Sequence, residues 1–223
     1  MKAGLLSLLV LVAIAAPAFA GGGRIQGVVT VPPAALDSGR KPNPYPGRAS
    51  SIQPREIAVR GSAADAVIYV ESIPASVDST LRTTGAVPAM EQREQAFVPR
   101  VVAVAQGGSV SFPNRDPIFH NVFSVSPVKR FDLGRYVKGK SKSVTFAKAG
   151  LVNVYCEIHS DMAGFILVTP NRAFAQPDST GRYSIPLLPP GQYTVVAWHP
   201  DLKSVRRTVK VPDGGDVSLD LNL

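Results

Sequence analysis

Several residue types are scarce in this sequence, and their scarcity excludes some classes of function. Its 223 residues include one cysteine and three histidines. A single cysteine excludes an internal disulfide. No arrangement of serine, histidine and acid stands out, so acid–base or nucleophilic hydrolysis has no support. Basic residues are not interleaved with aromatic ones, so nucleic acid is not an expected partner.

Long hydrophobic runs are also missing, with one exception at the N-terminus. Lys2 precedes an apolar run from Leu5 to Ala15, and a small-residue AFA sequence ends at Ala20. This is the pattern of a secretory signal peptide cleaved after Ala20, and it predicts a periplasmic protein. No later stretch is apolar enough to predict a transmembrane segment. Cleavage removes Lys2 and takes the formal charge from +8 to +7. This positive charge favours acidic protein partners or anionic envelope surfaces.

Helical periodicity is nearly absent, whereas glycine and proline are frequent, with 19 and 20 residues. Short apolar runs separated by Gly, Pro, Asn and Asp predict an all-β fold, with strands at 24–31 and 65–71 near the N-terminus. Residues 72–89 carry turn residues and no clear strand. The later expected strands, whose short regular spacing suggests a sandwich, are 97–105, 109–112, 120–125, 143–147, 151–156 and 164–169.

Two further segments differ from this pattern. Residues 33–64 are rich in Pro, Gly, Ser and Arg, which predicts a long basic surface loop. From Arg172 onward the chain has its own rhythm of short strands and turns, with the clearest alternation at 193–198 and 205–211. This tail predicts a second small β unit.

The single cysteine lies in the segment YCEIHSDM, where Cys156, His159 and Met162 follow C-x-x-H-x-x-M spacing. His120 lies upstream, in FPNRDPIFHNVF. A thiolate, two imidazoles and a thioether are the ligands of a blue-copper centre, in which His₂Cys lies in a trigonal plane and a weak Met lies on the axis. The set predicts one type 1 copper and one-electron transfer rather than catalysis. An unpaired cysteine is otherwise a liability in an oxidising compartment, which favours metal ligation for Cys156.

Other metals and other roles are alternatives at this site. Zinc accepts one Cys and two His but gains little from a thioether, whereas storage of cuprous copper tolerates the same set. A catalytic copper needs further histidines, and with two of three committed the sequence predicts no enzyme. Asn121 is a candidate for a hydrogen bond to the backbone near Cys156 that orients the imidazole of His120; its alternative is an ordinary turn residue. The carboxylates of Glu157 and Asp161 would spoil a soft site, so we expect them in solvent.

Two segments resemble the cupredoxins, especially plastocyanin and amicyanin. The first, AFVPRVVAVAQGGSVSFPNRDPIFHNVFS, is similar to the plastocyanin strand pair and first-histidine loop, including the His-Asn pair. The second, VYCEIHSDM, is similar to the cysteine strand and loop, and its step of three from His159 to Met162 resembles the short amicyanin loop. The resemblance covers residues 86–170.

This resemblance implies a Greek-key sandwich that holds a single type 1 copper through the four ligands named above and serves as a soluble electron shuttle. It also implies that the ring edge of His159 is the electron exit and that apolar residues surround it. The candidates for that apolar ring are Pro117, Ile118, Phe119 and Ala163.

The tail resembles a carboxypeptidase regulatory-like β-sandwich in its DSTGRYSI and LPPGQYTVVAW segments. The usual opening strands of that module stand near the N-terminus instead, as GRIQGVVTV and DAVIYVE. We therefore expect one sandwich that is split by an inserted cupredoxin; the alternative assigns the N-terminal strands to the cupredoxin sheet. The expected boundaries are a signal peptide at 1–20, N-terminal strands and loop at 21–85, the cupredoxin at 86–170 and the tail of the second sandwich at 171–223.

Two functions from different classes fit these observations. The first is a periplasmic one-electron carrier, monomeric, whose redox partner has an acidic docking surface because basic residues cluster between 129 and 142. The second is a copper-binding or envelope-interaction protein in which the metal is structural, sensory or stored. His199 has no Cys, Met or paired carboxylates nearby in the sequence and is left outside the site. The clustered basic residues are Lys129, Arg130, Arg135, Lys138, Lys140 and Lys142.

Overall fold

The computed structural model describes residues 21–32, 62–81 and 86–223. Within these ranges the regular structure is almost entirely β strand, with one short α-helix, α2 (Ala75–Thr80), and one 3-10 turn, η1 (Ala63–Asp65). The all-β prediction is confirmed. No helix in the described part of the chain is long and apolar enough to cross a membrane. The predicted signal peptide at 1–20 and most of the predicted basic loop, residues 33–61, lie outside the described residues.

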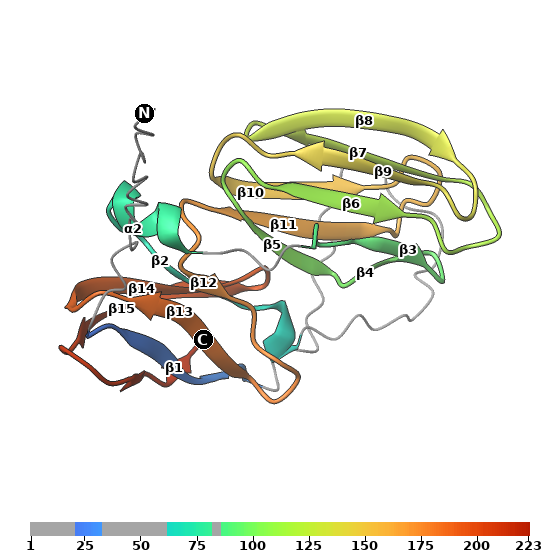
Figure 1. Ribbon diagram of the computed structural model, residues 1–223. Helices are drawn as coiled ribbons and strands as arrows, with labels where there is room; N and C mark the ends of the chain where they lie inside the picture. The colour runs from blue at the N-terminus through green and yellow to red at the C-terminus, as the bar shows by residue number, and fades with distance from the viewer. Residues whose placement is uncertain (1–20, 33–61, 82–85) are drawn as a thin grey trace, which may run out of the picture.

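The strands form two β-sandwiches that lie against each other (Figure 1). The first contains a five-stranded sheet in the order β5-β11-β10-β7-β8. Its strands are β5 (Val101–Ala105), β7 (His120–Ser126), β8 (Lys129–Tyr136), β10 (Gly150–Tyr155) and β11 (Ala163–Thr169). Two strand pairs complete this sandwich around a common apolar core. They are β6 (Ser109–Pro113) with β9 (Ser141–Thr145), and β3 (Glu91–Arg93) with β4 (Ala96–Val98).

The second sandwich uses strands from both ends of the described chain. One sheet has the order β13-β1-β16, with β17 also paired to β1, and the other has the order β12-β2-β14-β15. Its strands are β1 (Gly23–Thr30), β2 (Val67–Val70), β12 (Phe174–Ala175), β13 (Arg182–Leu188), β14 (Gly191–His199), β15 (Leu202–Val211), β16 (Val217–Ser218) and β17 (Leu221–Asn222). Antiparallel pairing places Ile25 of β1 opposite Ile185 of β13, and β2 runs antiparallel to β14. Residues far apart in the sequence therefore share one core.

Alternation along β2 explains how the two sandwiches join. Ile68 and Val70 face the core of the second sandwich, whereas Val67 and Tyr69 lie in an apolar cluster with residues of β5 and β11. Strands buried on both faces are apolar at successive positions, as in VIYV of β2 and VVAVA of β5. We call this shared cluster the joint. Its buried members are Val67, Val101, Ala103, Phe165 and Leu167.

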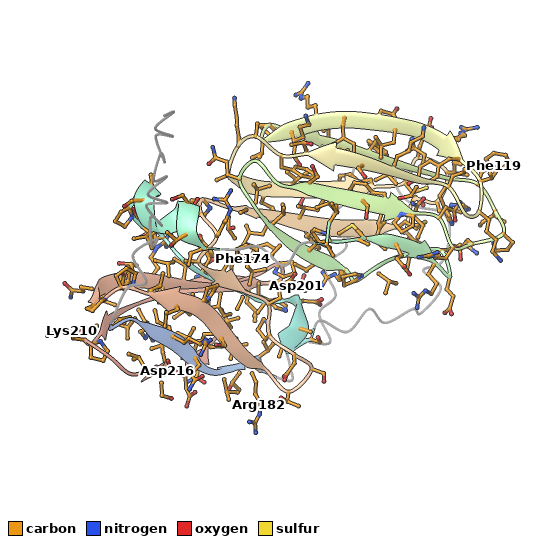
Figure 2. All side chains as sticks on the ribbon, viewed as in Figure 1. Phe119, Phe174, Arg182, Asp201, Lys210 and Asp216 are labelled. Atoms are coloured by element: carbon orange, nitrogen blue, oxygen red, sulfur yellow. The ribbon has the colours of Figure 1, made fainter. Side chains whose placement is uncertain are left out.

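The joint is closed at its margin by polar contacts. The side-chain amide of Gln176 accepts a hydrogen bond from the backbone N–H of Ala103 (3.0 Å) and donates one to the carbonyl of Val101 (3.2 Å). β5 is an edge strand of its sheet, so this amide occupies positions that a further strand would otherwise take. Figure 2 shows Phe174 and Asp201 between the two sandwiches.

Some expectations about the strands are wrong. The expected strand at 97–105 is two strands, β4 and β5, separated by Pro99 and Arg100, because proline has no N–H to donate to a ladder. The expectation of no clear strand in residues 72–89 agrees with the structure, which has the six-residue helix α2 there. β3 and β8 are absent from the expected strands. In β8 (KRFDLGRY) charged residues outnumber the half-buried apolar ones, since the strand lies at the edge of its sheet.

Candidate metal centre

His120, Cys156 and His159 come together at one end of the first sandwich. His120 is the first residue of β7, Cys156 follows directly after β10, and His159 lies in the loop between β10 and β11. β7 and β10 are neighbours in the sheet, with Tyr155 opposite Phe123, so the ends of the two strands lie side by side. His120 and Cys156 are buried, whereas His159 is half-buried.

The donor atoms of these three residues converge. Sγ of Cys156 lies 3.9 Å from Nδ1 of His120 and 3.7 Å from Nδ1 of His159, and the three donor atoms lie within 4.8 Å of one another. An ion about 2.3 Å from sulfur and about 2.05 Å from nitrogen, at an angle of about 120°, holds sulfur and nitrogen about 3.8 Å apart. The observed spacing therefore fits a trigonal His₂Cys site for a first-row transition metal.

Met162 lies next to these residues. The backbone N–H of Cys156 donates to the carbonyl of Met162 (3.3 Å), and the N–H of Met162 donates to the carbonyl of His159 (3.0 Å). The Met162 side chain is buried in the same apolar core as Cys156. If Met162 contributed its thioether beside the sulfur of Cys156, the soft donor set would suit copper better than zinc.

Asn121 connects the two ligand segments. Its Oδ1 accepts a hydrogen bond from the backbone N–H of Glu157 (3.2 Å), and its Nδ2 donates to Oδ1 of Asp132 on β8 (2.6 Å). The residue that follows Cys156 is thus held through its backbone. Glu157 and Asp161 are both exposed, so neither carboxylate lies within the buried ligand set.

Asp116 is a site residue that no sequence motif identified. Its Oδ2 lies 2.7 Å from Nε2 of His120, and its carboxylate also accepts hydrogen bonds from the backbone N–H groups of Glu94 (2.6 Å) and Gln95 (2.9 Å). Burial raises the pKa of Asp116, but the hydrogen bonds from Gln95, His120 and Glu94 outweigh it and hold the pKa below its usual value. In the tautomer that carries its proton on Nε2, His120 donates a hydrogen bond to this carboxylate and presents the lone pair of Nδ1 to Cys156.

A signal for Asp116 does exist in the sequence. A metal-ligating histidine commonly donates its other ring N–H to a carboxylate or a carbonyl. Asp116 is the one carboxylate in the segment FPNRDPIFHNVF that carries His120. A search for the partner of each expected imidazole therefore leads to this residue.

His159 presents the more accessible imidazole. Burial, and then the proximity of His120, lower the pKa of His159 below its usual value, so the ring is neutral at pH 7 and has a lone pair to offer. Exposed apolar residues precede both imidazoles in the two ligand loops, and Phe119 projects at the end of the molecule away from the second sandwich (Figure 2). These exposed residues are Pro117, Ile118, Phe119 and Ile158, whereas Ala163 is half-buried.

Comparisons with known proteins first concern the tail. Residues 166–223 match the family model of the carboxypeptidase regulatory-like domain. The resemblance expected for the tail is thereby confirmed. The matched residues include β12 to β17, whereas β1 and β2, which pair with these strands, lie outside the match.

Similar solved structures include amicyanins and a nitrite reductase. A reduced Cu(I) form of an amicyanin mutant at pH 4 is 23% identical, covers 47% of this chain and 98% of that chain, and has a TM-score of 0.35. The oxidised state of another amicyanin mutant is 23% identical at the same two coverages, with a TM-score of 0.36. The copper-containing nitrite reductase of Thermus scotoductus SA-01 is 23% identical, covers 43% of this chain and 27% of that chain, and has a TM-score of 0.36. The sequence has no significant match among curated proteins.

Proposed function

We propose that the protein is a periplasmic type 1 copper protein that carries one electron at a time, without catalysing a reaction. The observation that supports this function is the convergence of Cys156 Sγ with the Nδ1 atoms of His120 and His159, at 3.9 and 3.7 Å. Met162 is proposed as the weak fourth ligand. A bound copper ion would supply the one-electron redox chemistry.

The surroundings of the ligands favour rapid electron transfer because they hold the donor atoms in place. His120 and Cys156 are buried at the ends of neighbouring strands. Asp116 orients the ring of His120 through Nε2, and Asn121 holds the loop after Cys156 through a backbone N–H. Ligands that move little when the oxidation state changes keep the reorganisation small.

A redox partner with an acidic docking surface is proposed for the basic side of the first sandwich. β8, β9 and the turn between them carry one acidic residue, Asp132, and this carboxylate binds Asn121. A surface of one charge attracts an oppositely charged partner at a rate that falls as ionic strength rises. The cations are Lys129, which is half-buried, and the exposed Arg130, Arg135, Lys138, Lys140 and Lys142.

We also propose a division of the chain into two domains. A cupredoxin at 86–170 would be inserted into a regulatory-like sandwich made of 21–85 and 171–223, after removal of a signal peptide at 1–20. The pairing of β1 with β13 and of β2 with β14 supports this division. We propose that the mature chain is a monomer.

A second candidate function is binding of an envelope component, with copper in a structural, sensory or storage role. The match of residues 166–223 to a regulatory-like domain favours it, because this sandwich contains none of the proposed ligands. The two functions differ in what Cys156→Ser does. If the protein is an electron carrier, Cys156→Ser abolishes electron transfer. If it is a binding protein, the variant still binds its envelope partner.

The test is titration of the metal-free protein with cupric ion. We expect an intense visible band at one equivalent, reversible one-electron reduction, and loss of the band in Cys156→Ser. Circular dichroism of the variant checks that its fold is retained. An oxidised protein that stays colourless with one equivalent of bound copper contradicts the carrier function.

A further inference from the structure

The β3–β4 hairpin lies between two residues, Asp116, which contacts the metal centre, and Arg100, which contacts the second sandwich. Its turn residues, Glu94 and Gln95, have φ angles of 54° and 57°, which lie in the left-handed region that non-glycine residues seldom adopt. Such a conformation persists only when surrounding contacts determine it. The turn therefore needs a partner that holds it.

Asp116 is that partner. The backbone N–H of Glu94 donates to Oδ1 of Asp116 (2.6 Å), and the N–H of Gln95 donates to Oδ2 (2.9 Å). The same Oδ2 lies 2.7 Å from Nε2 of His120. The Asp116 carboxylate thus binds two consecutive amides of the turn and one ring nitrogen of a proposed metal ligand. Movement of the turn would therefore move the carboxylate that orients His120.

The other end of the hairpin is anchored at the joint. β4 leads through Pro99 to Arg100, whose guanidinium makes two hydrogen bonds to Asp201 (2.7 and 3.0 Å) and one to Asp65 (3.4 Å). It also lies 5.1 Å from the ring centroid of Phe165. Both carboxylates belong to the second sandwich, and Figure 2 shows Asp201 next to the first sandwich. A two-pronged, nearly buried arginine–carboxylate pair fixes both distance and orientation.

The hairpin between these two anchors has little freedom. Three residue pairs join β3 to β4, with Gln92 opposite Phe97 at the centre. Gln92 is fully buried, and its Nε2 donates to Tyr136 Oη (2.5 Å) and to the carbonyl of Phe112 (3.2 Å). The N–H of Arg115, the neighbour of Asp116, donates to the carbonyl of Gln92 (2.9 Å). The hairpin is therefore held at its centre as well as near its two ends.

We propose that the β3–β4 hairpin is the element through which the second sandwich sets the orientation of His120. Asp116 and Arg100 are the positioning residues at its two ends, and Asp201 is the anchor on the second sandwich. The inference rests on the proposed metal site and is independent of electron transfer. In this proposal the second sandwich helps to position the proposed metal site, although it contributes no ligand to it.

The first experiment uses Asp116→Asn. An asparagine offers one acceptor oxygen to three donors, so we expect the ring of His120 to lose its fixed tautomer. Nitrogen-15 shifts of the His120 ring in the metal-free protein report this directly. We also expect cupric affinity, measured by chelator competition, to fall about tenfold. Unchanged ring shifts overturn the role of Asp116.

The second experiment compares two variants that both weaken the joint. Asp201→Asn removes the negative charge and one of the two acceptor oxygens that hold Arg100, whereas Gln176→Ala removes the contact with β5 and leaves the hairpin anchored. We expect Asp201→Asn to shift the His120 ring signals and lower cupric affinity about threefold, and Gln176→Ala to change neither. Arg100→Lys keeps the charge but loses the two-pronged contact, and it serves as a second variant should Asp201→Asn fail to fold.

The proposal is overturned if Asp201→Asn and Gln176→Ala change the His120 ring signals equally. It is also overturned if Asp201→Asn and Arg100→Lys both leave these signals unchanged. The ring signals are read without metal. A wild-type protein that binds no copper therefore contradicts the proposed function while the metal-free spectra still decide whether the second sandwich positions His120.

Discussion

Sγ of Cys156 lies 3.9 Å from Nδ1 of His120, although the two residues are 36 positions apart in the sequence. The distance depends on the pairing of β7 with β10, where Phe123 stands opposite Tyr155 and their ring centroids are 5.7 Å apart. His159 instead reaches Cys156 within a three-residue step of one loop. The sheet thus sets one sulfur–nitrogen distance and the loop sets the other.

Replacement of Met162 by leucine tests the proposed axial thioether. The two side chains are close in volume, so we expect the fold to lose less than about 1.5 kcal/mol of stability. Loss of a weak donor destabilises the cupric form more than the cuprous form. We expect the reduction potential to rise by roughly 60 mV, which corresponds to a tenfold change in relative affinity for a one-electron couple.

The matched control is Met90→Leu, because Met90 is a second buried methionine of the same core. We expect its potential to equal that of the wild type in cyclic voltammetry. A potential that moves equally in both variants indicates a general packing effect and contradicts an axial role for Met162.

Asn121→Ala removes the side chain that holds the loop after Cys156. The N–H of Glu157 loses its partner, and Oδ1 of the exposed Asp132 keeps its hydrogen bond from the N–H of Gly134 but loses the one from Asn121. We expect a cost of about 1–3 kcal/mol. Urea unfolding of the metal-free protein measures this loss. The exposed Asn222 is the control, and we expect Asn222→Ala to change stability by less than about 0.5 kcal/mol. Equal stability of the two variants would count against the bridging role of Asn121.

His199 predicts a dependence of stability on pH that needs no metal. The side chain is buried, and this burial lowers the pKa of His199 below its usual value despite the nearby carboxylates of Asp201 and Asp65. Between the lowered pKa and about 6.5, the unfolded chain binds a proton at this position that the folded chain does not. Stability therefore falls as pH drops through this range, by up to about 1.4 kcal/mol per pH unit.

The measurement is urea unfolding of the metal-free protein at several pH values from 7 to 5. We expect His199→Gln to lose part of the pH dependence seen in the wild type. The part of the pH dependence of stability that comes from His159 is the same in the wild type and the variant. Identical slopes for the wild type and the variant would show that His199 does not titrate differently on folding.

Gln176→Ala opens the edge of β5. The N–H of Ala103 and the carbonyl of Val101 lose their partners, which we expect to cost about 1–3 kcal/mol. An open strand edge also invites pairing with another chain. We expect analytical ultracentrifugation to show concentration-dependent association of the variant, and a variant that stays monomeric at all concentrations argues against a protective role.

Much of this molecule can be predicted from local sequence patterns. Alternating apolar residues and frequent turn residues predict the all-β class, because side-chain direction repeats every two residues along a strand. The ligand candidates in YCEIHSDM follow from chemistry, since few functions need Cys156, His159 and Met162 together. Pro99 also marks the break between β4 and β5, although the expected strand ran through it.

The sequence by itself determined which residue types are available to a soft metal site and which faces of each strand are apolar. Only the tertiary structure decided that Asp116 also binds the turn of the β3–β4 hairpin, that Gln176 closes β5, and that Arg100 anchors a hairpin of one sandwich to Asp201 of the other. The physical reason is that composition and periodicity are properties of neighbouring residues. Hydrogen bonds between residues as far apart as Arg100 and Asp201 depend on strand register and on how the two sheets pack, which no local pattern records.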